Sequence, residues 1–192
     1  MKVVVGRDAP VEVASPSGIH AGWSLLVPPG LPNSATAHGA YSALFVDPGQ
    51  AALERTDRVL DLGRRRGEWL LEELDAEAGG HHRAARIPAG LADVLGPDQH
   101  PVGAALRRMT STTTIGDLAA RLGVSPQHVR RMLREHAGTT FGAIMRWHRL
   151  REAIALLPRS PIARAGAESG FADQAHLTRT STAMLGRTPG TF

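Results

Sequence analysis

The first half of the chain alternates short apolar runs with turn-forming residues. The runs are KVVVG (2–6), VEVAS (11–15), WSLLVPPG (23–30) and YSALFVDPG (41–49), and Pro, Gly, Asn and Asp separate them. Runs of this kind, about 8–12 residues apart, are typical of antiparallel strands. The pattern therefore predicts a small β-rich region, built as a sheet, a sandwich or a partial barrel.

After Pro48 the apolar positions change to helical spacing. Over residues 52–79 they are Leu53, Val59, Leu60, Trp69, Leu70 and Leu74. Gly63 and Gly67 are expected to break this segment into two helices. The next stretch, GGHHRAARIPAG (79–90), is small, polar and glycine-bearing, so it is predicted to be a linker.

Helix-start signals divide the second half of the chain. Thr114 followed by Asp117 resembles a capping box, with Asp in place of the usual Glu, and predicts a helix start at residue 115. Ser125 is expected to cap the next helix, with Pro126 at the first helical position, where its missing N–H costs nothing. Gly138 is a suitable stop for that helix.

The longest helix is predicted over residues 141–158. One apolar stripe runs along it, formed by Ile144, Trp147, Leu150, Ile154 and Leu157. Pro158 and Pro161 are expected to end it. Shorter helices are predicted at 101–111, 162–170 and 173–186.

Two stretches of the second half repeat each other. The pairs at an offset of 47 are Ile115 with Ile162, Ala120 with Ala167 and Gly123 with Gly170. The pairs at an offset of 48 are His128 with His176, Val129 with Leu177, Arg131 with Arg179 and Gly138 with Gly186. Each copy is a short helix, a glycine turn and a second helix, which is the helix-turn-helix plan. If one long helix holds the two recognition helices about 34 Å apart on one face, both can enter successive major grooves.

Charge divides the chain at the same place. Residues 1–95 contain nine Lys/Arg and twelve Asp/Glu, whereas residues 96–192 contain thirteen Arg and six Asp/Glu. A basic half beside an acidic half indicates a polyanion-binding module joined to another domain, and solvated helix faces are the alternative.

Composition excludes several classes of function. The chain has no cysteine, and no GxSxG, HExxH, P-loop or GxGxxG motif occurs in it. His20 and His38 have no recognisable ligand spacing, and His81 with His82 lies in the predicted linker. No apolar run approaches the ~20 residues that span a bilayer, and the first residues do not read as a signal peptide. We therefore expect a cytoplasmic protein without enzymatic activity, metal or cofactor.

The repeat also carries a family resemblance. The stretch TIGDLAARLGVSPQHVRRMLREHAGTTFGAIMRWHRLREAIALL, followed by GFADQAHLTR and LGRTPGTF, resembles the DNA-binding domain of the AraC/XylS family of bacterial transcription regulators. The resemblance covers about residues 100–192. It implies sequence-specific binding of promoter DNA by two helix-turn-helix subdomains joined by a long helix.

The expected fold class is α+β, with a small β-rich, cupin-like N-terminal domain plus helices, followed by an all-α double helix-turn-helix domain. Residues 1–78 are expected to form the sensor or dimerisation region, 79–97 the linker and 98–192 the DNA-binding domain. Within that domain, the expected parts are helix-turn-helix 1 (115–137), the connecting helix (141–157) and helix-turn-helix 2 (162–185).

Carried over by position, the resemblance implies two sets of DNA contacts. The candidates for reading bases are Gln127, Arg130, Arg131, Gln174, His176, Thr178 and Arg179. The candidates for binding phosphates are Ser125, Arg107, Arg108, Arg134, Arg146, Arg149 and Arg164. Arg131 and Arg179 can read guanine, grip phosphate or pair with an acid. The two glutamines can read adenine or be solvated, and His176 can lie at the groove edge or pack between helices.

The second copy departs from the first at three apolar positions. Leu133 is matched by Ser181, Leu118 by Ala165 and Ala119 by Gly166. Losing a large core side chain typically costs ~2–5 kcal/mol. We therefore predict a more loosely packed and less basic second subdomain, with the first dominating DNA affinity.

Residues 27–49 resemble the cupin-like sensor portion of many such regulators. The resemblance implies modulation by a ligand or partner and a homodimer through the N-terminal domain, with double-stranded promoter DNA and RNA polymerase as partners. Two alternatives remain at this point. One is a partner-dependent regulator with a degenerate second helix-turn-helix, and the other is a small cupin-type ligand-binding protein.

Overall fold

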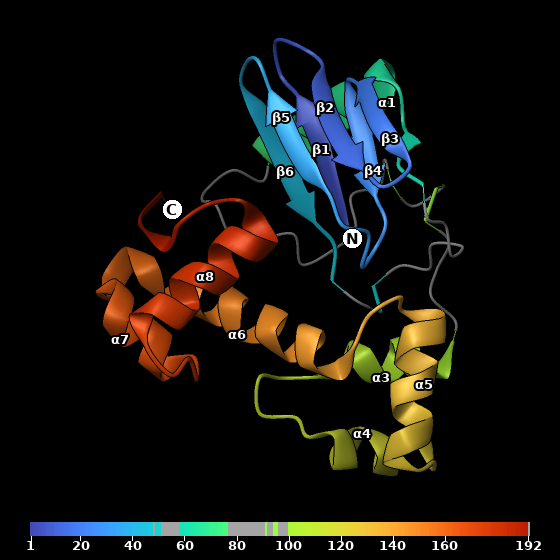
Figure 1. The fold of residues 1–192 in the computed structure, drawn as a ribbon, viewed down its shortest axis with the longest axis vertical. Helices are drawn as coiled ribbons and strands as arrows, with labels where there is room; N and C mark the ends of the chain where they lie inside the picture. The colour runs from blue at the N-terminus through green and yellow to red at the C-terminus, as the bar shows by residue number, and fades with distance from the viewer. Residues whose placement is uncertain (48, 51–57, 77–90, 92–93, 96–99, 192) are drawn as a thin grey trace. The chain divides into compact units, whose positions relative to one another are not determined.

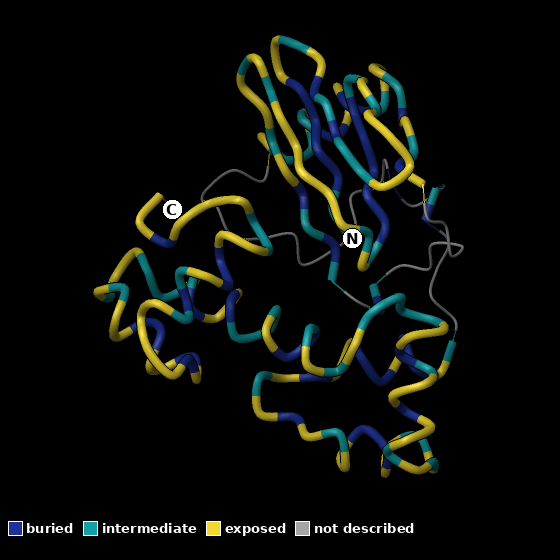
Figure 2. The backbone as a smooth tube through the Cα atoms, viewed as in Figure 1, coloured by how far each residue is buried: buried dark blue, intermediate teal, exposed yellow. Residues whose placement is uncertain are grey.

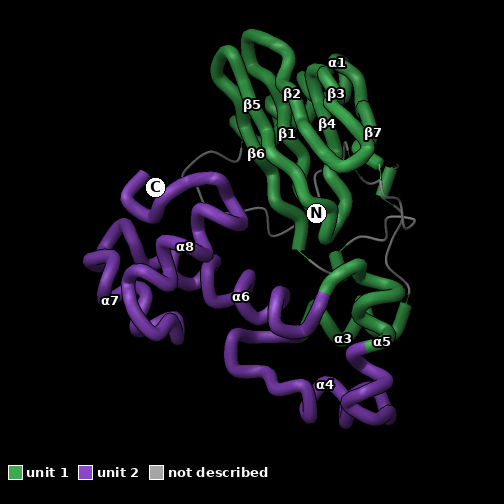
Figure 3. The backbone as a smooth tube through the Cα atoms, viewed as in Figure 1, with its two compact units in different colours: residues 1–108, 131–139 green, residues 109–130, 140–192 purple. Residues whose placement is uncertain are grey.

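The described part of the chain forms two compact units. The computed structural model, drawn in Figure 1, describes all residues except 48, 51–57, 77–90, 92–93, 96–99 and 192. One unit contains residues 1–108 and 131–139, and the other contains residues 109–130 and 140–192 (Figure 3). The predicted linker over 79–90 lies outside the described residues.

The first unit contains all of the strands that the structure describes, arranged in two antiparallel sheets. The strands are β1 (Lys2–Gly6), β2 (Val11–Ser15), β3 (Gly18–Gly22), β4 (Ser24–Val27), β5 (Ser34–Ala37), β6 (Tyr41–Phe45) and β7 (Leu60–Asp61). One sheet has the order β6-β1-β4-β7, and the other has the order β3-β2-β5. This arrangement confirms the predicted β-rich N-terminal region.

Strand β1 has an unbroken apolar run because both of its faces are covered. Val3 and Val5 belong to one buried cluster with Leu26 of β4, whereas Val4 belongs to a second cluster with Val13 of β2. Alternate residues of a strand point to opposite faces. A strand between two apolar layers therefore needs apolar residues at every position, and Figure 2 shows these strands as buried.

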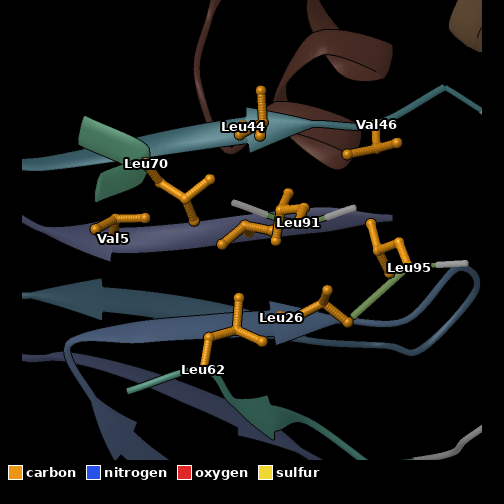
Figure 4. Close-up of a cluster of buried hydrophobic side chains, with 9 residues drawn as sticks. Val5, Leu26, Leu44, Val46, Leu62, Leu70, Leu91 and Leu95 are labelled. Atoms are coloured by element: carbon orange, nitrogen blue, oxygen red, sulfur yellow. The ribbon is translucent and has the colours of Figure 1, made fainter. Parts of the chain in front are cut away.

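Helix α1 (Arg64–Ala76) covers one face of the four-stranded sheet. It runs through Gly67 without interruption, so the predicted break at Gly67 is wrong. Figure 4 shows Leu70 of α1 against Val5 and Leu44. Gly67 lies inside the helix, and a Cβ there would come within 3.0 Å of Ser24 Cβ. Glycine therefore allows close approach of helix and sheet at this position. Gly63, with φ 78°, precedes the helix, but it follows strand β7 and so does not separate two helices as predicted.

The described residues just before α1 are not helical, which corrects the prediction for that part of the segment; residues 51–57 lie outside the described residues. Leu60 and Asp61 form β7, which pairs with Leu26 and Leu25 of β4. Strands β3 and β5 were not predicted at all. Their sequences, GIHAG and SATA, consist mostly of small residues without an apolar alternation, and they lie at the two edges of the smaller sheet. The hydrogen bonds to β2, rather than side-chain pattern, define these strands.

The second half of the chain is helical, as predicted. Its elements are α3 (Pro101–Leu106), α4 (Ile115–Leu122), α5 (Pro126–His136), α6 (Phe141–Leu156), η1 (Leu157–Arg159), α7 (Ile162–Glu168), α8 (Gln174–Leu185) and η2 (Pro189–Thr191). Helix α3 is shorter than the predicted 101–111 and belongs to the first unit. Together with the sheets, these helices confirm the α+β class. The predicted domain boundaries remain predictions.

The long helix α6 organises the second unit. It packs against α7 and α8, and a buried cluster of Leu150, Ala153, Phe171 and Leu177 lies between them. Thr140 caps its start, because the Thr140 side-chain oxygen accepts a hydrogen bond from the Ala143 N–H. This cap has the same Thr chemistry as Thr114 and was not predicted.

Candidate nucleic-acid interface

The first helix-turn-helix unit begins with a complete capping box. Thr114 Oγ1 accepts from the Asp117 N–H at 3.1 Å, and Asp117 Oδ2 accepts from the Thr114 N–H at 2.8 Å. These hydrogen bonds lower the pKa of Asp117, the backbone N–H of Thr114 contributing most. Gly123 ends α4 in the left-handed region, with φ 66°. The predicted start and turn of this unit are therefore confirmed.

Helix α5 starts at the predicted serine. Ser125 Oγ accepts from the His128 N–H at 3.2 Å, with Pro126 at the first helical position. The cap orders the first turn, on which Gln127 and Arg130 are exposed. Neither side chain has a hydrogen bond or ion pair to another residue in the described part of the chain. Both are therefore available to an external acceptor or donor.

The second helix-turn-helix, formed by α7 and α8, repeats the backbone plan of the first with different caps. Gly170, with φ 78°, makes the turn, and Asp173 caps α8 by accepting from the His176 N–H at 2.6 Å. Gly186 ends α8 with φ 72°, as Gly138 follows α5 with φ 59°. The predicted repeat is thus present in the backbone as well as in the sequence.

Four base-reading candidates are exposed and uncommitted. They are Gln127, Arg130, Gln174 and Arg179, and none has a hydrogen bond or ion pair to another described residue. Arg131 is also exposed, but its Nε lies 3.9 Å from Glu135 Oε2 one helical turn away. Such an exposed pair stabilises little and can exchange for another anion.

His176 and Thr178 are half-buried, unlike the other base-reading candidates. The His176 ring meets the Phe171 ring edge to face, with centroids 5.2 Å apart and an interplanar angle of 82°. Phe171 itself is buried against α6. The contact with Phe171 therefore supports the alternative that His176 packs between helices. Base reading by His176 remains a prediction.

The phosphate candidates in α6 and α7 differ in whether they already have a partner among the described residues. Arg146 is exposed, without a hydrogen bond or ion pair to another described residue. Arg164 Nε is 2.7 Å from Glu168 Oε1, and this hydrogen bond raises the pKa of Arg164. Arg149 is half-buried, and its Nη1 donates to the Gly170 carbonyl at 3.4 Å. Arg149 thus joins α6 to the turn before α8, a contact that only the folded chain reveals.

The phosphate candidates of the first unit also differ. Arg107 donates through Nη1 to the Gly49 carbonyl, which lies beside α3. Arg108 and Arg134 are exposed, and Arg134 has no hydrogen bond or ion pair to another described residue. The end of α5 belongs to the compact unit of residues 1–108 and 131–139. There the His136 ring stacks on the His100 ring, with centroids 4.0 Å apart.

Of the small core residues of the second copy, Ser181 makes a hydrogen bond and Gly166 lies against α8. Ser181 is fully buried, and its Oγ donates to the Arg187 carbonyl at 2.6 Å. A Cβ on Gly166 would lie 3.4 Å from Leu177 Cδ2, which is an ordinary van der Waals distance, so the packing of α8 on α7 does not require glycine at this position. Looser packing of the second copy stays a prediction. Ser181 and Gly166 are the positions at which it is expected.

The described residues show neither a metal-ligand cluster nor a membrane-spanning helix. Within the described residues, no group of three or more His, Asp or Glu side chains is placed to hold a metal ion. His20 Nε2 lies 3.1 Å from Ser17 Oγ, and His81 with His82 lies outside the described residues. None of the helices described here is long and apolar enough to cross a membrane.

Comparisons with known proteins point to the same region. A family model described as a helix-turn-helix domain matches residues 118–192. The HTH-type transcriptional regulator GlxA of Rhizobium meliloti (strain 1021) is 31% identical over 141 residues. The match covers 69% of this chain and 41% of GlxA, so the chain spans less than half of that relative's length.

Two solved structures resemble the whole chain in fold. ToxT from Vibrio cholerae matches with a TM-score of 0.63 at 10% identity, covering 99% of this chain and 88% of ToxT. ToxT of strain SCE256 with unsaturated fatty acid bound matches with a TM-score of 0.57 at 11% identity, covering 99% and 85%. At these identities the likeness shows a shared fold.

Proposed function

Because this chain belongs to the AraC/XylS family of transcription regulators, we propose that it binds promoter DNA by inserting α5 and α8 into two successive major grooves. The observation that carries the proposal is the pair of free polar side chains near the start of each recognition helix. These are Gln127 with Arg130 in α5 and Gln174 with Arg179 in α8. Side chains near the start of a recognition helix are those that reach base edges.

Each of these side chains fits a particular base. An arginine can donate two hydrogen bonds to guanine O6 and N7, and a glutamine can bind adenine N6 and N7. These four side chains have no partner among the described residues to give up, so DNA contact costs them no existing ion pair there. Arg131 can join them by leaving Glu135, while Thr178 and His176 are proposed as contacts at the groove edge.

Phosphate contacts are proposed for the exposed cations around these helices. Arg134 and Arg146 are the strongest members of this set because no described acid holds them. Ser125 retains its hydroxyl hydrogen for a phosphate oxygen while its lone pair caps α5. Arg107, Arg149 and Arg164 would each have to add a phosphate to an existing contact, so they rank below Arg134 and Arg146, while Arg108 stays a proposed phosphate contact without a rank.

Footprinting combined with salt titration tests the proposal. The full chain on its own promoter DNA should protect about two helical turns, and log K should fall linearly with log salt. Each phosphate contact removed should lower the slope by about 0.9, so Arg146→Ala should change it by about that amount. Arg159→Ala is the matched control, because Arg159 is an exposed arginine of η1, outside both helix-turn-helix units. Protection of one helical turn would implicate the first helix-turn-helix alone. Little binding of the chain to its promoter DNA at any salt concentration would favour the partner-dependent alternative.

The N-terminal unit is proposed to modulate this binding through a ligand or a partner, to form a homodimer, and to work with RNA polymerase at the promoter. Support for a ligand comes from the shared fold with ToxT, one structure of which contains an unsaturated fatty acid. A regulator of promoters acts on the chromosome, so the proposal includes a cytoplasmic location. The proposal also assigns the chain no enzymatic activity. Thermal shift of the chain with candidate apolar acids, read against DNA affinity, tests modulation.

A further inference from the structure

The two recognition helices align residue by residue from their caps. Ser125 accepts from the third helical N–H of α5, and Asp173 accepts from the third helical N–H of α8. The fourth and eighth positions are buried in both helices: they are Val129 and Leu133 in α5, and Leu177 and Ser181 in α8. Because both helices turn the same positions inward, the positions that they turn outward also correspond.

Four corresponding positions on the outer face carry different side chains. The second, fifth, sixth and ninth positions share one face of each helix, because they follow the second at spacings of three, four and seven residues. We name them the recognition stripe, which is Gln127, Arg130, Arg131 and Arg134 in α5, and Ala175, Thr178, Arg179 and Thr182 in α8. All of them are exposed except Thr178, which is half-buried. Apart from the sixth position, α8 therefore replaces each long polar side chain of α5 with alanine or threonine, and both of these carry a methyl group.

A methyl group on a recognition helix matches one base in particular. In the major groove thymine alone carries a methyl group, and alanine and threonine side chains make apolar contact with it. The side chain of Ala175 can neither donate nor accept a hydrogen bond. A base edge of donors and acceptors held against it would lose hydrogen bonds to water without replacement, which is costly. Contact with a thymine methyl instead removes apolar surface from water on both sides and is favourable.

Ala175 and Thr178 are the members of the α8 stripe that combine a methyl group with a place near the start of the helix. Side chains near that end are the ones that reach base edges, and Thr182 lies one turn beyond Thr178. Ala175 and Thr178 are three residues apart, so they are neighbours on the helix surface. The Thr178 hydroxyl has no hydrogen bond to another described residue, so no such bond fixes the direction of this side chain.

We propose that Ala175 and Thr178 read thymine through its C5 methyl group. The half-site of α8 then has thymine where the half-site of α5 has the bases read by Gln127 and Arg130, so the operator is asymmetric in sequence. Arg179 keeps the sixth position, which Arg131 holds in α5, so the two half-sites share one arginine contact. This inference rests on the proposed function, because it concerns the same interface, and it names the bases of the second half-site.

Deoxyuridine in place of thymidine tests the inference, because it keeps the base pair and lacks only the C5 methyl. The probe is the promoter duplex that the full chain protects, and the α8 half-site is the one whose protection depends on Arg179. Replacing thymines in that half-site should lower the affinity about fourfold for each methyl contacted, the loss expected for one group of CH₂ size. The same replacement in the α5 half-site should change the affinity by less than about twofold, because Gln127 and Arg130 bind through hydrogen bonds.

Variants of the two residues connect this effect to α8. Thr178→Ser removes the γ-methyl and keeps the hydroxyl, so it should weaken binding about fourfold on the thymine probe. On the deoxyuridine probe it should weaken binding no further, because the contact is already lost. Ala175→Gln introduces the residue of the α5 stripe and should abolish the deoxyuridine effect at its own base. Thr36→Ser, in an exposed part of β5, is the matched control and should leave both affinities unchanged.

The outcomes separate this inference from the proposed function. Equal affinities for the thymine and deoxyuridine probes, with an intact footprint, would overturn the inference and leave the proposed function standing. Equal weakening of Thr178→Ser on both probes would also contradict it, because the loss would then come from the packing of α8. Absence of any footprint on unmodified promoter DNA would overturn the proposed function, and the inference with it.

Discussion

The two helix-turn-helix units share a backbone plan but differ in side chains. Both turn at a left-handed glycine, Gly123 or Gly170, and both recognition helices begin with a side-chain cap. The first unit keeps Leu133 at a position where the second has Ser181, and both residues are fully buried. The first recognition helix exposes three arginines, whereas Arg179 is the only arginine in α8.

The difference shows which parts of the motif can vary together. Caps and glycine turns determine where helices start and bend, and they are retained in both copies. A large core side chain can be replaced when a buried hydroxyl finds a carbonyl, as at Ser181, which stands where the first copy has Leu133. The surface cations can then be reduced without altering the backbone plan.

The largest expected effect comes from the core. Leu133→Ala should lower the free energy of unfolding by ~2–5 kcal/mol, because it removes a fully buried side chain. The matched change in the other copy, Ser181→Ala, should cost ~1 kcal/mol, because it leaves the Arg187 carbonyl without its hydrogen bond. Urea denaturation measures both. Equal losses would mean that the second copy depends on Ser181 as strongly as the first depends on leucine.

The next effect concerns DNA affinity. Arg130→Ala should weaken binding about tenfold and relax base preference in its half-site, the expected loss of one bidentate guanine contact. Arg179→Ala should weaken binding about threefold and remove protection of the second half-site only. Titrations on a probe with both half-sites, at one fixed salt concentration, measure these changes. A larger loss from Arg179→Ala would reverse the predicted order of the two units.

The glycine turns should respond alike. Gly123→Ala and Gly170→Ala each force an L-residue into the left-handed region, which costs ~1–2 kcal/mol. A Cβ would meet nothing within 4 Å at Gly123 and only ordinary contact with Arg149 Nε, at 3.5 Å, at Gly170. Thermal unfolding should therefore give similar shifts for the two variants. A markedly larger shift at Gly170 would show that the Arg149 contact is part of the turn.

The smallest effect separates the first helices of the two units. The pKa of Asp117 is lowered by its hydrogen bonds with Thr114, so the capping box stabilises α4 above the unfolded pKa of ~3.9. That stabilisation is lost as pH falls through the lower, folded pKa. Helix α7 begins after Pro161 without a side-chain cap and should show no such step. NMR shifts of the amides at 114–117 and 162–164 between pH 5 and about 2 test this, with Asp117→Asn as the control that abolishes the step.

Local signals in the sequence predicted much of the helical region but less of the β region. The capping box at Thr114, the cap at Ser125 and the turns at Gly123 and Gly170 were all confirmed, because each depends on residues within one turn. Gly67 was misread as a break, because its close contact is with a strand far away in the sequence. Strands β3 and β5 carry no pattern of their own and exist through their pairing with β2.

The sequence by itself determined where the helices begin, where they turn and which residues stand near the start of each recognition helix. These features depend on backbone conformation and on neighbours within a few residues. The tertiary structure alone decided which polar side chains remain available. It joins Arg149 to the Gly170 carbonyl and Arg107 to the Gly49 carbonyl, while Arg130 and Arg179 keep no partner among the described residues. A cation is free or engaged according to the groups that folding brings beside it, and those groups lie far from it along the chain.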